Sequence, residues 1–300
     1  MTKKSSEINL DISKTEKYLS MALDEVITLR STRQLAESTR SAPWLLETEI
    51  AGEIKQFVLR IDADIELREI QVMRAMADIP EIPTPDINGW DADGETFGTP
   101  CFFYDYIDGE SLLSPMLAGA DWAVDLYLNT VLCLNQITRD QLAALGCEFG
   151  PALTAMEELQ QAHAYFVTNL SKLTENVYQK LIDTQPVFPE ARFSNGDLWL
   201  DNLLVKDEEL VGVIDFEHAG FSDPIYEFLL PFFNEPRLRG RGIEAAYCRR
   251  LGMDPAILHW YHGLEYYDTL HYVAKSGEAF NQYSEEKLTE ELHKWYLVGD

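Results

Sequence analysis

The separation of strand-type from helix-type patterns along the chain is the strongest constraint on its fold. Residues 26–35 and 44–61 are rich in strand formers, and Ala51-Gly52 suits a turn between two strands of the second run. A further apolar strand is expected over residues 100–107, which read PCFFYDYI. Patterns of helical spacing dominate the second half of the chain. Strands first and helices afterwards predict an α+β protein of two lobes.

The hinge between these lobes is expected at Asp108-Gly109, directly after the apolar strand. Residues 1–107 then form a small N-terminal lobe with a leading helix, and residues 108–300 form a larger, mainly helical C-terminal lobe. Helical spacing is found over residues 12–24, 65–77, 121–137 and 154–182, and again from residue 242 onward.

The charge balance of the chain restricts its partners. A net charge of −27 repels the phosphates of nucleic acids and the surface of anionic membranes, so neither is expected as a partner. The same charge could concentrate a cationic ligand near a cleft, although a solvated acidic surface is the simpler explanation.

Targeting and cysteine patterns point to an ordinary intracellular protein. The first 20 residues contain no apolar run of signal-peptide length, and no later stretch is long enough to cross a bilayer. The four cysteines are scattered without a CxxC pair, so neither a disulfide framework nor a zinc module is indicated. We expect a soluble, cytoplasmic protein with reduced cysteines.

Chemically informative residues are concentrated in two neighbouring segments, NGDLWLDN (195–202) and VGVIDFE (211–217). Asp197 precedes Asn202 by five residues, and a strand pattern then ends at Asp215, which is the spacing of a kinase catalytic loop and its metal-binding Asp. In-line phosphoryl transfer requires a carboxylate that deprotonates the attacking hydroxyl, and oxygen ligands that hold Mg²⁺ against the phosphates. The spacing predicts Asp197 as the base and Asn202 and Asp215 as metal ligands. An ordinary polar turn is the alternative, but it leaves the apolar strand LVGVI unexplained.

These segments resemble the aminoglycoside phosphotransferase and choline kinase superfamily, and the likeness extends over about residues 26–273. The family pattern HGDLxxxNxLV, GVIDWE and GDPxxD corresponds here to NGDLWLDNLLV, GVIDFE and FSDPIYEF. The resemblance implies a two-lobed protein-kinase-like fold, with a nucleotide-binding N-terminal lobe built on a mostly antiparallel sheet. It further implies a C-terminal catalytic and substrate-binding lobe, and ATP- and Mg²⁺-dependent phosphorylation of a hydroxyl group on a small molecule.

Two departures from the family pattern favour an alternative function. Asn195 stands where the family usually has His, and the loop over residues 36–42 lacks the glycines of a phosphate-covering lid. Asn can brace a loop through hydrogen bonds to the backbone, so we expect weakened rather than abolished activity. The alternative is a nucleotide-binding pseudokinase with a regulatory or scaffolding role. Asn135 is a further departure, where the family often has His and where a plain helix-borne polar residue is an equal alternative.

Arg60 is the candidate phosphate-binding residue of the N-terminal lobe. Alternation along the strand places Arg60 and Val58 on one face, and the forked guanidinium suits phosphate oxygens. Glu69, on the following helix, is the ion-pair partner that the family resemblance favours for Arg60. An exposed strand Arg and a solvated helix Glu are the alternatives.

Other nucleotide contacts are expected from the lid loop and from the strand that links the lobes. Ser38 and Arg40 could donate hydrogen bonds to phosphate oxygens. The resemblance implies that Phe103, Tyr104 and Tyr106 present backbone groups to adenine, with a plain core strand as the alternative.

The acceptor is expected to bind to the helical lobe. Glu265 and Asp268 lie three residues apart beside several tyrosines, and carboxylates with aromatic faces suit ammonium groups, although an aromatic stripe is often core. Asp223 and Glu227 match the GDPxxD region and are more often structural. Aminoglycosides, other antibiotics, sugars and choline-like alcohols all remain possible acceptors. An arginine cluster could bind an anionic acceptor or pair with surface acids instead, and it comprises Arg237, Arg239, Arg241, Arg249 and Arg250.

Overall fold

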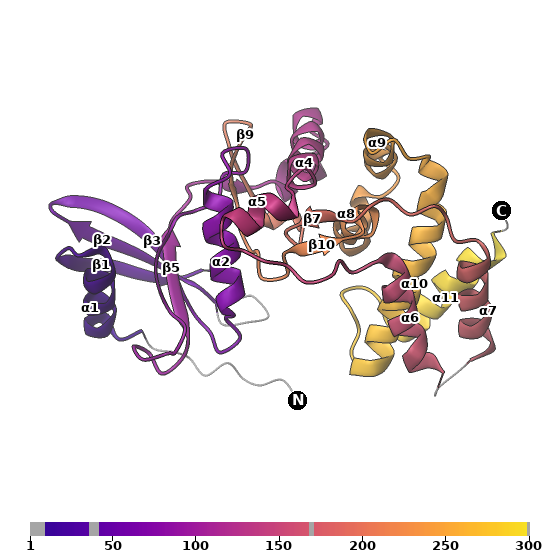
Figure 1. Ribbon diagram of the computed structural model, residues 1–300, viewed down its shortest axis with the longest axis horizontal. Coiled ribbons are helices and arrows are strands. Elements are labelled where there is room, and N and C mark those ends of the chain that lie inside the picture. The colour runs from indigo at the N-terminus through magenta and orange to yellow at the C-terminus, as the bar shows by residue number, and fades with distance from the viewer. Residues whose placement is uncertain (1–9, 36–41, 168–170, 299–300) are drawn as a thin grey trace. The chain divides into compact units, whose positions relative to one another are not determined.

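The computed structural model describes residues 10–35, 42–167 and 171–298, whose secondary structure is drawn in Figure 1. They divide into two compact units, and each is described by itself. The first unit comprises Met1–Ser111, Asp140–Glu148 and Asp201–Ala219, and the second comprises Leu112–Arg139, Phe149–Leu200 and Gly220–Asp300. The lobe boundary expected after residue 107 stays a prediction. None of the helices in the described ranges is long and apolar enough to cross a membrane.

The first unit is built on an antiparallel five-stranded sheet in the order β1-β2-β3-β5-β4. The sequence led us to expect an antiparallel sheet, but not its strand β4. A smaller sheet, β6-β8-β9, belongs to the same unit. The elements are α1 (Ile12–Leu23), β1 (Ile27–Gln34), β2 (Trp44–Ile50), β3 (Glu53–Ile61), α2 (Leu67–Ala77), β4 (Ile87–Asp91), β5 (Cys101–Asp105), β6 (Glu110–Ser111), α5 (Arg139–Ala144), β8 (Leu203–Lys206) and β9 (Glu209–Val213).

The turn between β2 and β3 lies at the dipeptide that the sequence indicated. Ala51 and Gly52 have φ angles of 50° and 88°, and a two-residue type I′ hairpin turn requires positive φ at both central positions. The turn sets the register in which Leu45 pairs with Val58 and Trp44 with Leu59. That register places Arg60 and Val58 on one face of β3, with Phe57 and Leu59 on the other.

Helix α1 covers one face of the larger sheet (Figure 1). Asp11 caps the helix by accepting a hydrogen bond from the backbone N–H of Lys14 at 3.0 Å. The buried side chains of Tyr18 and Leu19 pack against the sheet residues on this face, including Phe103. The α1 face is therefore core, and the opposite face carries Arg60.

Strand β4 was not predicted, because three of its five residues, Asn88, Gly89 and Asp91, are types depleted in strands. At its centre, a Cβ added to Gly89 would lie 2.6 Å from the ring of Phe103 and 2.8 Å from Cβ of Ala22. Only a glycine lets this edge strand lie so close to α1 and to the ring of Phe103. The requirement comes from packing and leaves no periodic signal in the sequence.

The second unit is largely helical, as expected, with one short two-stranded sheet. Its elements are α3 (Leu113–Ala118), α4 (Asp121–Leu134), α6 (Ala155–Phe166), α7 (Lys172–Asp183), β7 (Arg192–Ser194), β10 (Gly220–Ser222), α8 (Pro224–Asn234), α9 (Ile243–Arg250), α10 (Leu258–Ser276) and α11 (Glu285–Leu297).

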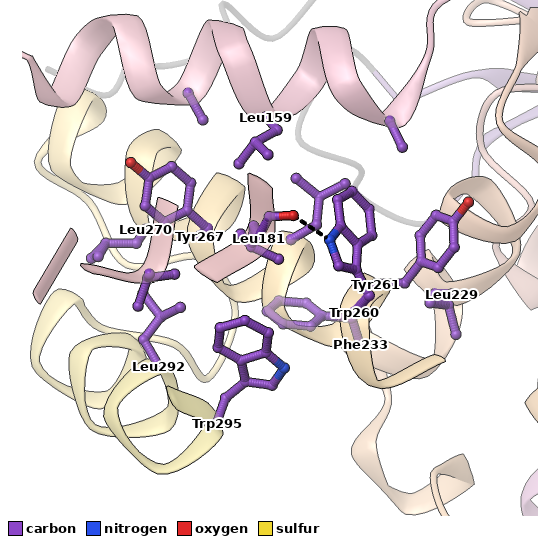
Figure 2. Close-up of a cluster of buried hydrophobic side chains, with 14 of the residues drawn as sticks. Leu159, Leu181, Leu229, Phe233, Trp260, Tyr261, Tyr267, Leu270, Leu292 and Trp295 are labelled. Carbon is purple, nitrogen blue, oxygen red and sulfur yellow. Dashed lines mark hydrogen bonds between the residues drawn. The ribbon is translucent and has the colours of Figure 1, made fainter. Parts of the chain in front are cut away.

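Helices α6, α7, α10 and α11 enclose the main core of this unit (Figure 2). The indole N–H of Trp260 on α10 donates a hydrogen bond of 2.8 Å to the carbonyl oxygen of Leu181 on α7, drawn as a dashed line in Figure 2. The helical pattern over residues 154–182 forms two helices rather than one. Each begins with a capping box, at Thr154 and at Ser171, which is why a second helix starts within the pattern.

Candidate functional site

The loop around Asp197 is braced by Asn195, which is fully buried. Its amide Nδ2 donates a hydrogen bond of 3.1 Å to the carbonyl oxygen of Asp197, and its Oδ1 accepts one of 3.2 Å from the N–H of Asp197. Between them, Gly196 has a φ of 76°, in the left-handed region that favours glycine. The structure confirms that Asn at this position can hydrogen-bond to the loop backbone.

Two further buried residues hold the strand that leads into this loop, and sequence reasoning did not assign them this part. Asn135, at the end of α4, donates a hydrogen bond of 3.1 Å from Nδ2 to the carbonyl oxygen of Phe193 on β7. Its Oδ1 accepts a hydrogen bond from the hydroxyl of Tyr247 on α9. Asn135 therefore connects two helices to the strand before Asp197. It supports this part of the fold and is more than a plain polar residue on a helix.

Asn202 and Asp215 lie at the same end of the β8-β9 hairpin, just before β8 begins and just after β9 ends. Leu203 pairs with Val213 in the hairpin, and the N–H of Ile214 donates a hydrogen bond of 3.0 Å to the carbonyl oxygen of Asn202. Residues 202 and 215 thus flank the first paired positions of the two strands. The spacing seen in the sequence corresponds to adjacency in the fold, because a hairpin folds its two ends together.

Asp215 is held in an unusual conformation with one oxygen unsatisfied. Its φ is 64°, which is uncommon for a residue other than glycine and stores strain in the backbone. Its Oδ1 is buried and accepts no hydrogen bond from any described residue. A buried carboxylate oxygen without a partner is costly unless a cation or a donor compensates it.

The chemistry of Asn202 and Asp215 fits a hard divalent cation. Amide and carboxylate oxygens are the ligands that Mg²⁺ prefers, and Mg²⁺ is commonly held by one or two carboxylates together with substrate phosphates. In the described ranges, no group of three or more His, Cys, Asp or Glu side chains is arranged to hold a metal.

The predicted ion pair between Arg60 and Glu69 is present. Arg60 on β3 donates a hydrogen bond to Oε1 of Glu69 on α2, and Glu69 is only 1% exposed. The guanidinium also lies 3.8 Å from Oε2 of Glu217 and 5.3 Å from the ring centroid of Phe102. Sequence reasoning did not single out Glu217, although it stands two residues after Asp215. Carboxylates on two elements and a ring face thus orient the guanidinium.

The strand residues expected near the nucleotide differ in position. Tyr104 is buried on the Arg60 face, and its pKa is raised to about 12, mainly by burial; Arg60 opposes the shift, while Asp215 and Glu69 add to it. These groups therefore lie within electrostatic reach of one another. The side chain of Phe103 is in the core on the α1 face, so only its backbone could serve a ligand on the Arg60 face.

The remaining predicted nucleotide contacts are less defined. The N–H of Tyr106 donates a hydrogen bond of 3.1 Å to the carbonyl oxygen of Gln56, which extends the pairing between β5 and β3. Ser38 and Arg40 lie outside the described residues.

Three of the four predicted acceptor residues meet at one pocket of the second unit. Glu227 on α8 and Glu265 and Asp268 on α10 line a pocket of about 250 Å³ that also reaches Gly196 of the loop. Asp223 plays a different part, because it caps α8 by accepting hydrogen bonds from the N–H groups of residues 225 and 226, at 2.9 and 3.1 Å.

Four of the five arginines of the cluster make polar contacts within the second unit. Arg239 donates a hydrogen bond of 2.9 Å to Oε2 of Glu265, and Arg237 forms an ion pair of 2.6 Å with Glu235. Arg241 donates to backbone carbonyl oxygens and Arg250 to side chains of α4. These contacts agree with the explanation that the arginines pair with acids and carbonyls of the protein itself.

A comparison with known families connects these features. Residues 33–263 match the phosphotransferase enzyme family. The chain belongs to this family. The braced loop at Asp197 and the β8-β9 hairpin both lie inside the matched range.

Solved structures of the phosphotransferase family have the same fold. A candidate aminoglycoside phosphotransferase from Ralstonia eutropha JMP134 aligns with a TM-score of 0.71 at 15% identity, covering 96% of this chain and 98% of that one. A thermostable mutant of aminoglycoside phosphotransferase APH(4)-Ia, in complex with AMP-PNP and hygromycin B, aligns with a TM-score of 0.66 at 14% identity. The alignment covers 96% of this chain and 100% of that one. A complex of APH(2")-IIIa with GDP and kanamycin aligns with a TM-score of 0.66 at 18% identity. The alignment covers 95% of this chain and 98% of that one. The expected kinase-like α+β fold is confirmed.

Proposed function

We propose that this member of the phosphotransferase family is a small-molecule kinase, which transfers the γ-phosphoryl group of ATP to a hydroxyl group. The observation that carries the proposal is the hairpin end that presents Asn202 and Asp215 together, with a buried carboxylate oxygen that no described residue satisfies. Two structural relatives were solved with nucleotides and aminoglycosides, which supports a nucleotide as donor and a small molecule as acceptor. The cytoplasm is the compartment that we propose.

Each motif residue has a part in this reaction. Asp197 orients the acceptor hydroxyl and takes its proton as the oxygen attacks the γ-phosphorus, while the bond from that phosphorus to the β-γ bridging oxygen breaks and ADP leaves. Asn202 and Asp215 hold Mg²⁺, which when bound neutralises charge on the phosphate oxygens. Arg60 binds phosphate oxygens through its guanidinium, and Glu69 and Glu217 keep that group in place.

The acceptor binds, in this proposal, at the pocket that reaches Gly196. Gly196 precedes the base in the sequence, so a ligand in the pocket lies beside the loop that carries Asp197. Glu227, Glu265 and Asp268 supply acceptor oxygens for hydroxyl or amine groups of the ligand.

The proposal is tested by Mg²⁺-dependent ADP release against a panel of aminoglycosides, macrolides, amino alcohols, sugars and ketosamines. We expect one acceptor class to stimulate release, and Asp215→Ala to abolish that stimulation because it removes a metal ligand. Asp197→Asn should lower kcat by about a hundredfold to ten-thousandfold with ATP binding unchanged, since only the base is lost.

Asp201→Asn is the matched control, because Asp201 lies in the same loop and accepts a hydrogen bond from the hydroxyl of Ser111. It should keep near-normal turnover. Unchanged turnover in Asp197→Asn would contradict the assignment of the base. Silence across the panel despite Mg-ATP binding would instead favour an acceptor outside the panel or the pseudokinase alternative.

A further inference from the structure

A second pocket, of about 440 Å³, lies against α2 and has no part in the proposed reaction; we call it the α2 pocket. All of its lining residues belong to the first unit. Four of them recur at helical spacing along α2, so they share the face of the helix that is turned away from Glu69. These four are Gln71, Arg74, Ala75 and Asp78.

Arg74 is held at the α2 pocket by a ring face rather than by an acid. Its guanidinium lies over the exposed ring of Trp90 on β4, 4.8 Å from the ring centroid. It forms no ion pair or hydrogen bond with any residue in the described part of the chain, although Asp78 lies one turn away on α2. Its N–H donors are therefore open to a ligand carboxylate, which a guanidinium binds through two parallel hydrogen bonds. The amide of Gln71, one turn earlier on the same face, supplies a further donor.

The other end of the α2 pocket is negative. Asp78 follows the last residue of α2, and Asp86 comes directly before β4. Both side chains are exposed, and neither carboxylate has a partner among the residues that the structure describes. The C-terminal end of a helix also carries negative charge, so a cation is favoured beside Asp78. This end therefore fits an ammonium group.

The separation of the two ends restricts the ligand. Arg74 and Asp78 are four residues apart, which corresponds to about 6 Å along the helix axis. Asp86 precedes Trp90 by four residues, or about 13 Å of extended chain, so it too lies away from the guanidinium. The two charges of a single α-amino acid are too close together to reach both ends.

The α2 pocket also has an apolar wall. Leu145, in the segment after α5, lines the pocket and is 39% exposed, and Ile87 lines it at the start of β4. Figure 1 shows α5 beside α2. Apolar side chains in a pocket with charged ends suit the uncharged middle of a ligand.

We propose that the α2 pocket binds a small zwitterion, whose carboxylate is held by Arg74 and Gln71 and whose ammonium group, about 6 Å away, is held by Asp78 and Asp86. A simple anion is repelled by the net charge of −27, whereas a zwitterion brings its own positive charge. A dipeptide and an ω-amino acid share this chemistry. Binding requires neither nucleotide nor metal, so the inference goes beyond the proposed kinase function and does not depend on it.

Binding is measured by isothermal titration calorimetry on the full chain without nucleotide or Mg²⁺. The test probes are glycylglycine and 5-aminopentanoate, in which the same number of bonds connects the amine to the carboxylate. We expect the tighter of the two to bind with a Kd of about 1 mM, because exposed charge pairs each contribute little. The control probes are glycine, whose charges are too close, and pentanoate and pentylamine, which each lack one charge. They should bind about fivefold or more weakly.

Two sets of variants test the two ends of the pocket. Arg74→Gln should weaken binding of the zwitterion about threefold to tenfold, because the charged fork is lost. Arg33→Gln is its matched control, since it makes the same change at an exposed position of β1, and it should bind as the parent does.

The double variant Asp78→Asn, Asp86→Asn should cause a similar loss, because it removes both carboxylates that hold the ammonium group. Asp93→Asn, at another exposed position of the first unit, is its control. The substituted side chains are exposed, and an unchanged Tm confirms that each variant is folded.

Tighter binding of glycylglycine identifies a dipeptide site, and tighter binding of 5-aminopentanoate identifies a site for an ω-amino acid; both results support the inference. Equal affinity for any control probe, unchanged binding in Arg74→Gln, or no binding of either zwitterion at concentrations about tenfold above the expected Kd would overturn it. ADP release is measured separately, so a chain that binds the zwitterion and releases no ADP keeps this inference and loses the kinase proposal.

Discussion

At the residue scale, the most informative side chains are those whose local environment departs from the ordinary. Asp215 combines a positive φ with a buried, unpaired oxygen, and such strain persists where the surrounding structure enforces it. Asn195 is an unusual residue at its position in the family motif, but its surroundings are ordinary. Its amide makes two hydrogen bonds to the backbone of the loop that it braces. Residue type alone did not distinguish these cases, since the partners of each side chain decide its part.

Asp223 is predicted to contribute to stability rather than to turnover. Asp223→Ala removes the cap of α8 and leaves the buried hydroxyl of Tyr261, which donates a hydrogen bond of 2.6 Å to Oδ2, without its acceptor. We expect the free energy of unfolding to fall by about 2 to 4 kcal/mol in urea denaturation. A loss well below this range would show that α8 is capped in another way.

The charge of Asp223 should also give stability a pH dependence. Burial raises its pKa above the ordinary 3.8, so the folded state binds its proton more tightly than the unfolded state. Its contribution is therefore present below the unfolded pKa and declines as pH rises from 3.8 through the raised value. The difference in unfolding free energy between the parent and Asp223→Asn, measured from about pH 3 to about pH 7, should fall over this window.

At the scale of elements, the loop around Asp197 depends on helices that are distant in the sequence. Asn135 joins α4 and α9 to β7, the strand that leads into the loop. The β8-β9 hairpin brings Asn202 and Asp215 together by its register. No pattern in the sequence indicated the hydrogen bonds of Asn135. The closeness of Asn202 and Asp215, in contrast, was indicated by their spacing and by the apolar strand between them.

Asn135→Ala tests the first connection. The variant leaves the carbonyl oxygen of Phe193 and the hydroxyl of Tyr247 unsatisfied in a buried site, which should lower the free energy of unfolding by about 2 to 4 kcal/mol. Tyr247→Phe removes only one of the two hydrogen bonds and should lose roughly half as much. Equal losses in both variants, by urea denaturation, would mean that the bond to Phe193 contributes little.

At the scale of the whole molecule, charge is the dominant property. The sequence contains 51 acidic and 24 basic side chains, and a net charge of −27 makes the folded chain repel itself. Salt screens this repulsion, because the Debye length falls from about 30 Å at 0.01 M to about 8 Å at 0.15 M ionic strength. We predict that Tm rises over this range in differential scanning calorimetry. A neutral osmolyte at matched osmolality is the control, and a flat or falling Tm would contradict the prediction.

The sequence by itself determined the α+β class, the hairpin turn at Ala51-Gly52 and the motif around Asp197. Each is encoded by neighbours in the chain, through periodicity, turn chemistry or motif spacing. Only the tertiary structure decided that Gly89 packs against Phe103, that Glu217 flanks Arg60, that Asn135 supports the loop and that Glu265 accepts a hydrogen bond from Arg239. These features depend on burial and on contacts between residues far apart in the chain, which no local pattern records.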